Sequence, residues 1–128
     1  MPKSLVAYIY GDLTASQGLT EFISGGYTAV PVIDREGIYL GVVSERDFLY
    51  RLLENKNEES MRADTVTIAE LASCSRFEPV QIDADMDTLF SRIIEQNFVP
   101  VIDSRGMFSG IVTRKDVLMF MKKRLSGQ

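Results

Sequence analysis

The feature that most constrains the fold of this chain is an internal repeat. The segment from Pro31 to Asp47, PVIDREGIYLGVVSERD, aligns without a gap with the segment from Pro100 to Asp116, PVIDSRGMFSGIVTRKD. Both ends of the alignment are 69 positions apart (100 − 31 and 116 − 47), and eight of the 17 aligned pairs are identical. Because chance rarely produces such self-similarity, we infer an internal duplication within the 128 residues.

Each repeat is expected to contain a strand, a helix, two strands of a hairpin, and a second helix. The turns DREG and DSRG separate runs rich in β-branched residues, which is typical of hairpins. Apolar residues then recur at helical spacing. The expected strands are 6–10, 29–34, 38–44, 79–83, 98–103 and 107–113, and the expected helices are 14–24, 46–54, 86–96 and 115–124.

The repeats differ in length upstream of the hairpin. Asp12 aligns with Asp83, an offset of 71 positions, whereas the hairpins are offset by 69. The second repeat is therefore two residues shorter between its first helix and its proline.

These patterns predict an α/β fold of two β-α-β-β-α repeats. We place repeat 1 at 1–53 and repeat 2 at 76–128, with a charged connector at 54–75 that includes a helical turn at 67–71. Neither repeat is long enough to bury both faces of its sheet. The two are therefore expected to pack sheet to sheet with pseudo-two-fold symmetry.

Composition excludes several classes of protein. A net charge of −4 argues against a nucleic-acid surface, and no apolar run is long enough to span a membrane. The chain has no histidine and one cysteine, so it lacks the commonest general base and metal ligand and cannot form an internal disulfide. The alternating Asp83, Asp85 and Asp87 fail as a calcium loop and are expected at a helix N-terminus. We expect a cytoplasmic protein that is not an enzyme and holds no metal or cofactor.

The repeated segments AVPVIDREGIYLGVVSERD and FVPVIDSRGMFSGIVTRKD, with DLTASQGL and DADMDTLF before them, resemble a tandem pair of CBS domains, or Bateman module. The similarity extends from about residue 5 to residue 124 and includes stand-alone bacterial CBS-pair proteins, some of which bind cyclic di-AMP. The resemblance implies a regulatory module that binds an adenine nucleotide, AMP or ATP foremost, in clefts between the repeats. It also implies a homodimer that signals to a partner protein, whose identity the sequence does not give.

The family pattern also implies the ligand-binding residues. A hydroxyl and an aspartate in a T/S-x-x-D motif contact phosphate and ribose, and the first strand of each hairpin lines the purine pocket. The residues expected in one cleft are Ser44, Arg46, Asp47, Ala29, Val30 and Pro31, and those in the other are Thr113, Arg114, Lys115, Asp116, Phe98, Val99 and Pro100.

Physical chemistry supports this role and also offers a simpler one. A helix N-terminus presents free N–H groups and a positive dipole end to a phosphate, and Arg114 and Lys115 would add charge-assisted bonds. The same T/S-x-x-D spacing is, however, a capping box in which the side chains satisfy the helix itself. The first copy also has Glu45 where the second has Arg114. We therefore expect the second copy to be the better anion site.

The function predicted from the sequence is thus a nucleotide sensor. A constitutive dimerisation or protein-interaction module without ligand, and a cyclic di-AMP receptor, stay open as alternatives. Which nucleotide binds, and whether one or both clefts are used, cannot be decided from the sequence.

Overall fold

The computed structural model describes residues 7–54, 66–72 and 77–127. These residues form two compact units that divide after Arg76. Cys74 and most of the predicted connector lie outside the described residues. None of the helices in the described ranges combines the length and the apolar character needed to cross a bilayer.

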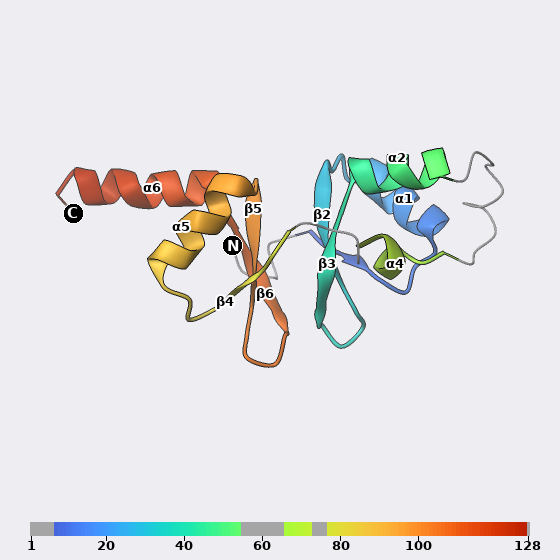
Figure 1. Cartoon of the computed structure of the whole chain (residues 1–128), viewed down its shortest axis with the longest axis horizontal. Coiled ribbons are helices and arrows are strands. Elements are labelled where there is room, and N and C mark those ends of the chain that lie inside the picture. Colours follow the sequence, from blue (N-terminus) through green and yellow to red (C-terminus); the bar gives the residue numbers. More distant parts are fainter. Residues whose placement is uncertain (1–6, 55–65, 73–76, 128) are drawn as a thin grey trace. The chain divides into compact units, whose positions relative to one another are not determined.

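The first unit is a three-stranded mixed sheet with its helices on one face (Figure 1). Strand β2 lies in the middle, parallel to β1 and antiparallel to β3. The elements are β1 (Ile9–Tyr10), α1 (Ala15–Ser24), β2 (Ala29–Ile33), β3 (Tyr39–Ser44), α2 (Glu45–Glu54) and α4 (Ile68–Ala72).

The second unit repeats this topology in the strand order β4-β5-β6. The pairing of Phe98 with Thr113 in β5 and β6 matches that of Ala29 with Ser44 in β2 and β3, and both hairpins shift register after the equivalent valine. The predicted fold class and the duplication are confirmed. The elements are β4 (Val80–Gln81), α5 (Met86–Glu95), β5 (Phe98–Ile102), β6 (Phe108–Thr113) and α6 (Arg114–Leu125).

The hairpin turns are built alike in the two units. Asp34 Oδ1 accepts hydrogen bonds from the N–H groups of Glu36 and Ile38, both at 2.9 Å. Asp103 Oδ1 accepts from Arg105 at 2.8 Å and from Met107 at 3.0 Å. This is the local side-chain bonding that makes aspartate a turn residue, as the sequence predicts.

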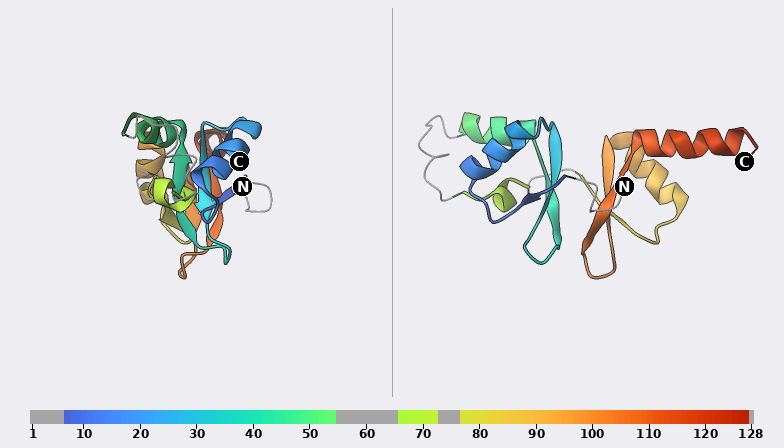
Figure 2. Two further views of the ribbon diagram at one scale, coloured as in Figure 1. Left: turned by 90° about the vertical axis from the view of Figure 1, so that its right-hand side faces the viewer. Right: turned by 180° about the vertical axis from the view of Figure 1, so that it is seen from behind.

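Each core lies between one face of a sheet and its own helices (Figures 1 and 2). Alternate residues of the central strands point into it, as the two-residue period of a strand requires. The first core contains Ile9, Ala15, Phe22, Val30, Val32, Val43, Phe48, Val66, Ile68, Leu71 and Ala72. The second contains Val80, Ile93 and Val99, with Ala84, Leu89, Val101 and Val117 against them.

Helix α4 is part of the first unit, although the sequence places it in a connector. Ile68 is fully buried in the first core, and its N–H donates to Leu13 O at 2.9 Å. The Ala15 N–H donates to Val66 O at 2.8 Å, and that of Ala69 to Gly11 O at 2.9 Å. Residues 66–72 thus complete the core of the first repeat, with a helical turn close to the predicted 67–71.

The length difference between the repeats lies in one loop. Four residues, 25–28, join α1 to β2, whereas two residues, 96–97, join α5 to β5. The predicted deletion therefore shortens the segment that leads directly to the strand opposite the T/S-x-x-D motif.

Candidate functional site

The candidate site in each unit is the point where the second hairpin strand becomes a helix. Ser44 ends β3 and Thr113 ends β6, and the following residue begins α2 or α6. Strand pairing places Ala29 opposite Ser44 and Phe98 opposite Thr113. Each T/S-x-x-D motif therefore lies beside the first residue of the strand that the sequence assigns to the ligand pocket.

The second motif forms a reciprocal capping box. The Asp116 N–H donates to Thr113 Oγ1 at 3.1 Å, and the Thr113 N–H donates to Asp116 Oδ2 at 2.8 Å. The bond from the Thr113 N–H holds the pKa of the Asp116 carboxyl below its usual range. The capping role that the spacing allows is present here, and it keeps Asp116 ionised at the start of α6.

The first motif uses its hydroxyl differently. The Ser44 N–H and the Ser44 hydroxyl both donate to Asp47 Oδ2, at 2.8 and 3.0 Å. The Ser44 hydroxyl therefore donates to its aspartate, whereas Thr113 Oγ1 accepts from the Asp116 N–H and the Thr113 hydroxyl also helps to lower the pKa of the Asp116 carboxyl.

The first backbone N–H groups of α2 and α6 also differ in their hydrogen bonding. The Glu45 N–H donates to Thr28 O at 3.0 Å. Among the described residues, no group accepts a hydrogen bond from the Arg114 N–H. Since free N–H groups at a helix N-terminus attract anions, the start of α6 has more capacity left for a phosphate than the start of α2.

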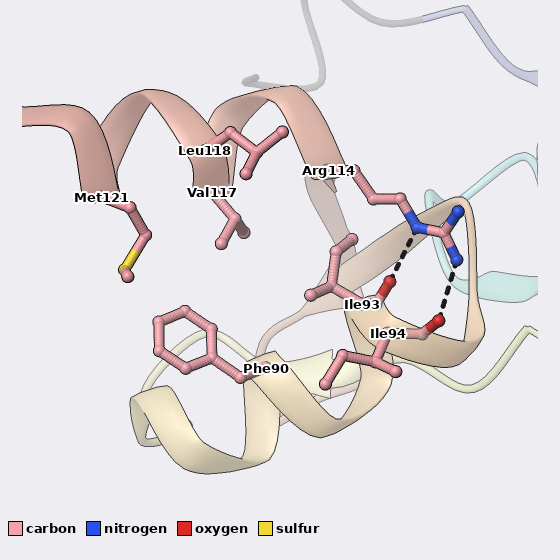
Figure 3. Close-up of a pocket in the computed structure, with 7 residues that line it drawn as sticks. All are labelled: Phe90, Ile93, Ile94, Arg114, Val117, Leu118 and Met121. Carbon is pink, nitrogen blue, oxygen red and sulfur yellow. Dashed lines mark hydrogen bonds between the residues drawn. The ribbon is translucent and has the colours of Figure 1, made fainter.

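The charged residues inside the motifs have distinct surroundings. Arg114 Nε and Nη2 donate to the carbonyl oxygens of Ile93 and Ile94 at the end of α5, both at 2.9 Å (Figure 3). Arg46 Nη2 donates to the Tyr50 hydroxyl at 3.0 Å. Lys115 is exposed at the first turn of α6. In this conformation the Arg114 guanidinium bonds to α5 and is not arranged for the phosphate contact that the sequence predicts.

The strand residues predicted to line a purine pocket separate into two sets. Val30 and Val99 lie in the cores of their own units. The two-residue period of a strand forces this outcome, because neighbours point to opposite faces. The residues on the other face are Ala29, Pro31, Phe98 and Pro100.

Two contacts near the second motif were not predicted. The rings of Phe77 and Phe98 stack with their centroids 5.0 Å apart. Gln96 Nε2 donates to the carbonyl oxygens of Phe98 and Glu78, both at 3.2 Å. A lone aromatic or amide residue carries no periodic signal in the sequence, so only the fold reveals these partners.

An apolar groove lies between α5 and α6 on the second unit (Figure 3). Its volume is about 370 Å³, and the Arg114 side chain is its one polar wall. The apolar lining consists of Phe90, Ile93, Ile94, Val117, Leu118 and Met121.

Asp85, directly before α5, has a structural role. Asp85 Oδ1 accepts from the Thr88 N–H at 2.8 Å and caps α5, as the sequence predicts for this cluster. Within the described parts of the chain, no three histidine, cysteine or carboxylate residues come together as metal ligands would.

Comparison with known proteins identifies related chains. The model of the CBS domain matches residues 3–54 and 66–123. A UPF0053 protein of Synechocystis is 26% identical over 91% of this chain, which spans 32% of that protein's length. The cyclic di-AMP receptor B of Bacillus subtilis is 24% identical over 94% of this chain and 81% of its own.

Solved structures give the same picture. CbpB from Streptococcus agalactiae superposes with a TM-score of 0.87 and 27% identity, covering 98% of this chain and 78% of its own. A structure of CbpB in complex with c-di-AMP has a TM-score of 0.86 and 27% identity, over 98% and 83%. CBSX2 in complex with AMP has a TM-score of 0.72 at 21% identity, over 96% and 92%.

Proposed function

The chain belongs to the CBS domain family, and from this premise we propose that it is a non-enzymatic receptor that binds cyclic di-AMP through the Thr113–Asp116 motif. Binding would shift the population of conformations that a partner protein reads. The relatives that match nearly the whole chain and most of their own length include a receptor and the CbpB proteins, which supports a receptor over an enzyme.

The observation that carries this proposal is the state of the second motif. Among the described residues the Arg114 N–H has no hydrogen-bond acceptor, and the next residue, Lys115, is exposed in the first turn of α6. Hydroxyl, ammonium and backbone N–H are the donors that a phosphodiester requires. The first motif has engaged its serine proton and carries Glu45 beside it, which would repel an anion.

The choice of cyclic di-AMP differs from the AMP or ATP that the sequence favours. The CbpB complex with c-di-AMP resembles this chain at 27% identity, whereas the AMP complex of CBSX2, at 21%, shares the fold alone. An anionic dinucleotide also suits a motif with the exposed Lys115 between its hydroxyl and its carboxylate.

The test is thermal unfolding of the full chain with cyclic di-AMP, cyclic di-GMP, AMP or ATP. Ligand at a hundred times its Kd should raise Tm by about 10 °C. We expect this rise with cyclic di-AMP and a smaller one or none with the others. Thr113→Val, which removes the hydroxyl at nearly constant volume, should abolish most of it. A rise with AMP alone would return the assignment to a mononucleotide sensor.

A second function, self-association, is favoured by the exposed apolar residues of the helices. In the second unit Ile94 and Leu118 are 74% and 68% exposed, and the equivalent Ile23 and Leu49 of the first unit are 68% and 59% exposed. Repetition of an exposed apolar face at equivalent positions supports a homodimer formed through these helices. Sedimentation velocity of the unliganded chain would test it, with a monomer at all concentrations as the contradicting result.

A further inference from the structure

Helices α1 and α5 are equivalent, but their last carbonyl groups are bonded in different ways. In the first unit the Gly26 N–H donates to Ile23 O at 3.0 Å, and the Tyr27 N–H donates to Phe22 O at 3.3 Å. Gly26 has a φ of +67°. This is a Schellman motif, completed by an edge-to-face contact between the rings of Phe22 and Tyr27.

The second unit has no room for that motif. Its loop is two residues shorter, and Gln96 already has extended backbone, with φ −119° and ψ 144°. The carbonyls equivalent to those of Phe22 and Ile23, at an offset of 71, belong to Ile93 and Ile94. These are the two oxygens that accept hydrogen bonds from Arg114 (Figure 3).

The substitution at position 114 matches the deletion. At an offset of 69, Arg114 is equivalent to Glu45, whose carboxylate accepts hydrogen bonds and cannot donate to a carbonyl. A guanidinium has several donors in a fixed plane and suits the negative end of a helix. One side chain thus supplies two bonds equivalent to those that Gly26 and Tyr27 supply in the first unit.

We infer that Arg114 is a positioning residue: it replaces the missing Schellman cap and fixes the end of α5 to the start of α6, beside the Thr113–Asp116 motif. The two-residue loop that follows α5 leads directly to Phe98, which pairs with Thr113. By bonding to the end of α5, Arg114 fixes the point from which the loop leads to β5, and β5 pairs with β6 beside the motif. On the basis of the proposed function, we assign the contact with ligand phosphate to Lys115 instead.

The first experiment is a double-mutant cycle on stability in the full chain. One change is Arg114→Met, which keeps the apolar stem and removes the guanidinium. The other replaces residues 96–97 with the four residues Gly-Gly-Tyr-Thr of positions 25–28, which restores a Schellman loop. In the native loop Arg114→Met should lower Tm by about 3–6 °C. In the grafted loop it should lower Tm by less than about 1 °C, because backbone N–H groups then cap α5.

Equal losses of Tm in both loops would overturn the cap replacement. Glu45→Met, at the equivalent position of the first repeat, is the matched control and should change Tm by less than about 1 °C. If the graft does not fold, the reciprocal pair decides. Deletion of residues 25 and 26 should lower Tm, and Glu45→Arg added to it should restore part of the loss. No restoration would contradict the inference.

The second experiment separates positioning from ligand contact. Cyclic di-AMP is titrated calorimetrically into the grafted chain with Arg114, with Arg114→Met and with Lys115→Met. Positioning predicts that Arg114→Met changes Kd by less than about threefold in the grafted loop, while Lys115→Met weakens binding about tenfold. A tenfold loss for Arg114→Met in the grafted loop would show that Arg114 contacts the ligand.

The two experiments also distinguish this inference from the proposed function. If the unmodified chain binds no cyclic di-AMP, the proposed function and the role of Lys115 both fall. The stability cycle would still confirm or refute Arg114 as the cap of α5, because it uses no ligand.

Discussion

Removing the Ile68 side chain tests whether residues 66–72 belong to the first repeat. The side chain is fully buried and lies in the first core with Phe22 and Leu71. Truncation of a buried isoleucine to alanine typically costs about 2–5 kcal/mol, and isoleucine to valine about 0.5–1.5 kcal/mol. Because Ile68 has no exposed surface, we expect about 3–4 kcal/mol for Ile68→Ala and about 1 kcal/mol for Ile68→Val.

Urea denaturation followed by circular dichroism measures these losses. With a slope of about 1.5 kcal/mol per M, Ile68→Ala should lower the midpoint by about 2 M with an unchanged slope. The control is Ile82→Ala, because Ile82 is 66% exposed and its truncation should cost less than about 0.5 kcal/mol. Equal midpoints for the Ile68 and Ile82 variants would refute the placement of α4 in the core.

Three further predictions concern acid stability, a glycine and self-association. The cap lowers the pKa of Asp116 in the folded state, so its stabilisation is present above the unfolded pKa near 4 and is lost as pH falls through the folded pKa. The difference in Tm between the native chain and Asp116→Asn should therefore shrink from pH 6 to pH 2. A constant difference would contradict this. Gly41→Ala should lower the free energy of unfolding, measured in urea, by at least about 1 kcal/mol more than Gly26→Ala. The reason is that a Cβ at Gly41 would lie 2.6 Å from Ala72 O, whereas one at Gly26 meets open space. Equal losses would argue against that contact. Leu118→Glu should halve the mass measured by light scattering, whereas Leu125→Glu, at the end of α6, should leave a dimer; two dimers would remove the α5–α6 face from the interface.

The periodic features of the chain could be predicted from its sequence. The offset of 69 correctly identified equivalent hairpins, which have the same register because repeats with the same alternation of apolar residues pair in the same way. The change to an offset of 71 correctly located a loop two residues shorter. Both signals depend on local pattern, which tertiary context did not override.

What could not be predicted depends on contacts between distant residues. The segment TIAEL shows a helical turn but does not show that Ile68 fills the first core. Arg114 lies in the family motif, so its charge suggested phosphate, while its partners are carbonyls about twenty residues earlier. Val30 and Val99 were assigned with their strand neighbours, although alternation directs them into the cores.

The two T/S-x-x-D motifs show why the capping and binding interpretations need not exclude each other. In the second motif the cap uses Asp116 N–H, Thr113 N–H and one carboxylate oxygen. It also orients the carboxylate, which a ribose hydroxyl could approach. In the first motif the Ser44 hydroxyl bonds to the Asp47 carboxylate, and the T/S-x-x-D spacing alone does not specify which partner the hydroxyl takes.

The measurement that tests the central claim most directly is a calorimetric titration of cyclic di-AMP into three forms of the full chain. These are the unmodified chain, the pair Thr113→Ala with Asp116→Ala, and the matched pair Ser44→Ala with Asp47→Ala. The account predicts saturable binding by the unmodified chain, loss of at least about tenfold in affinity for the Thr113 and Asp116 pair, and less than about threefold for the Ser44 and Asp47 pair. Loss of binding in the Ser44 and Asp47 pair alone, or no binding by the unmodified chain, would contradict it.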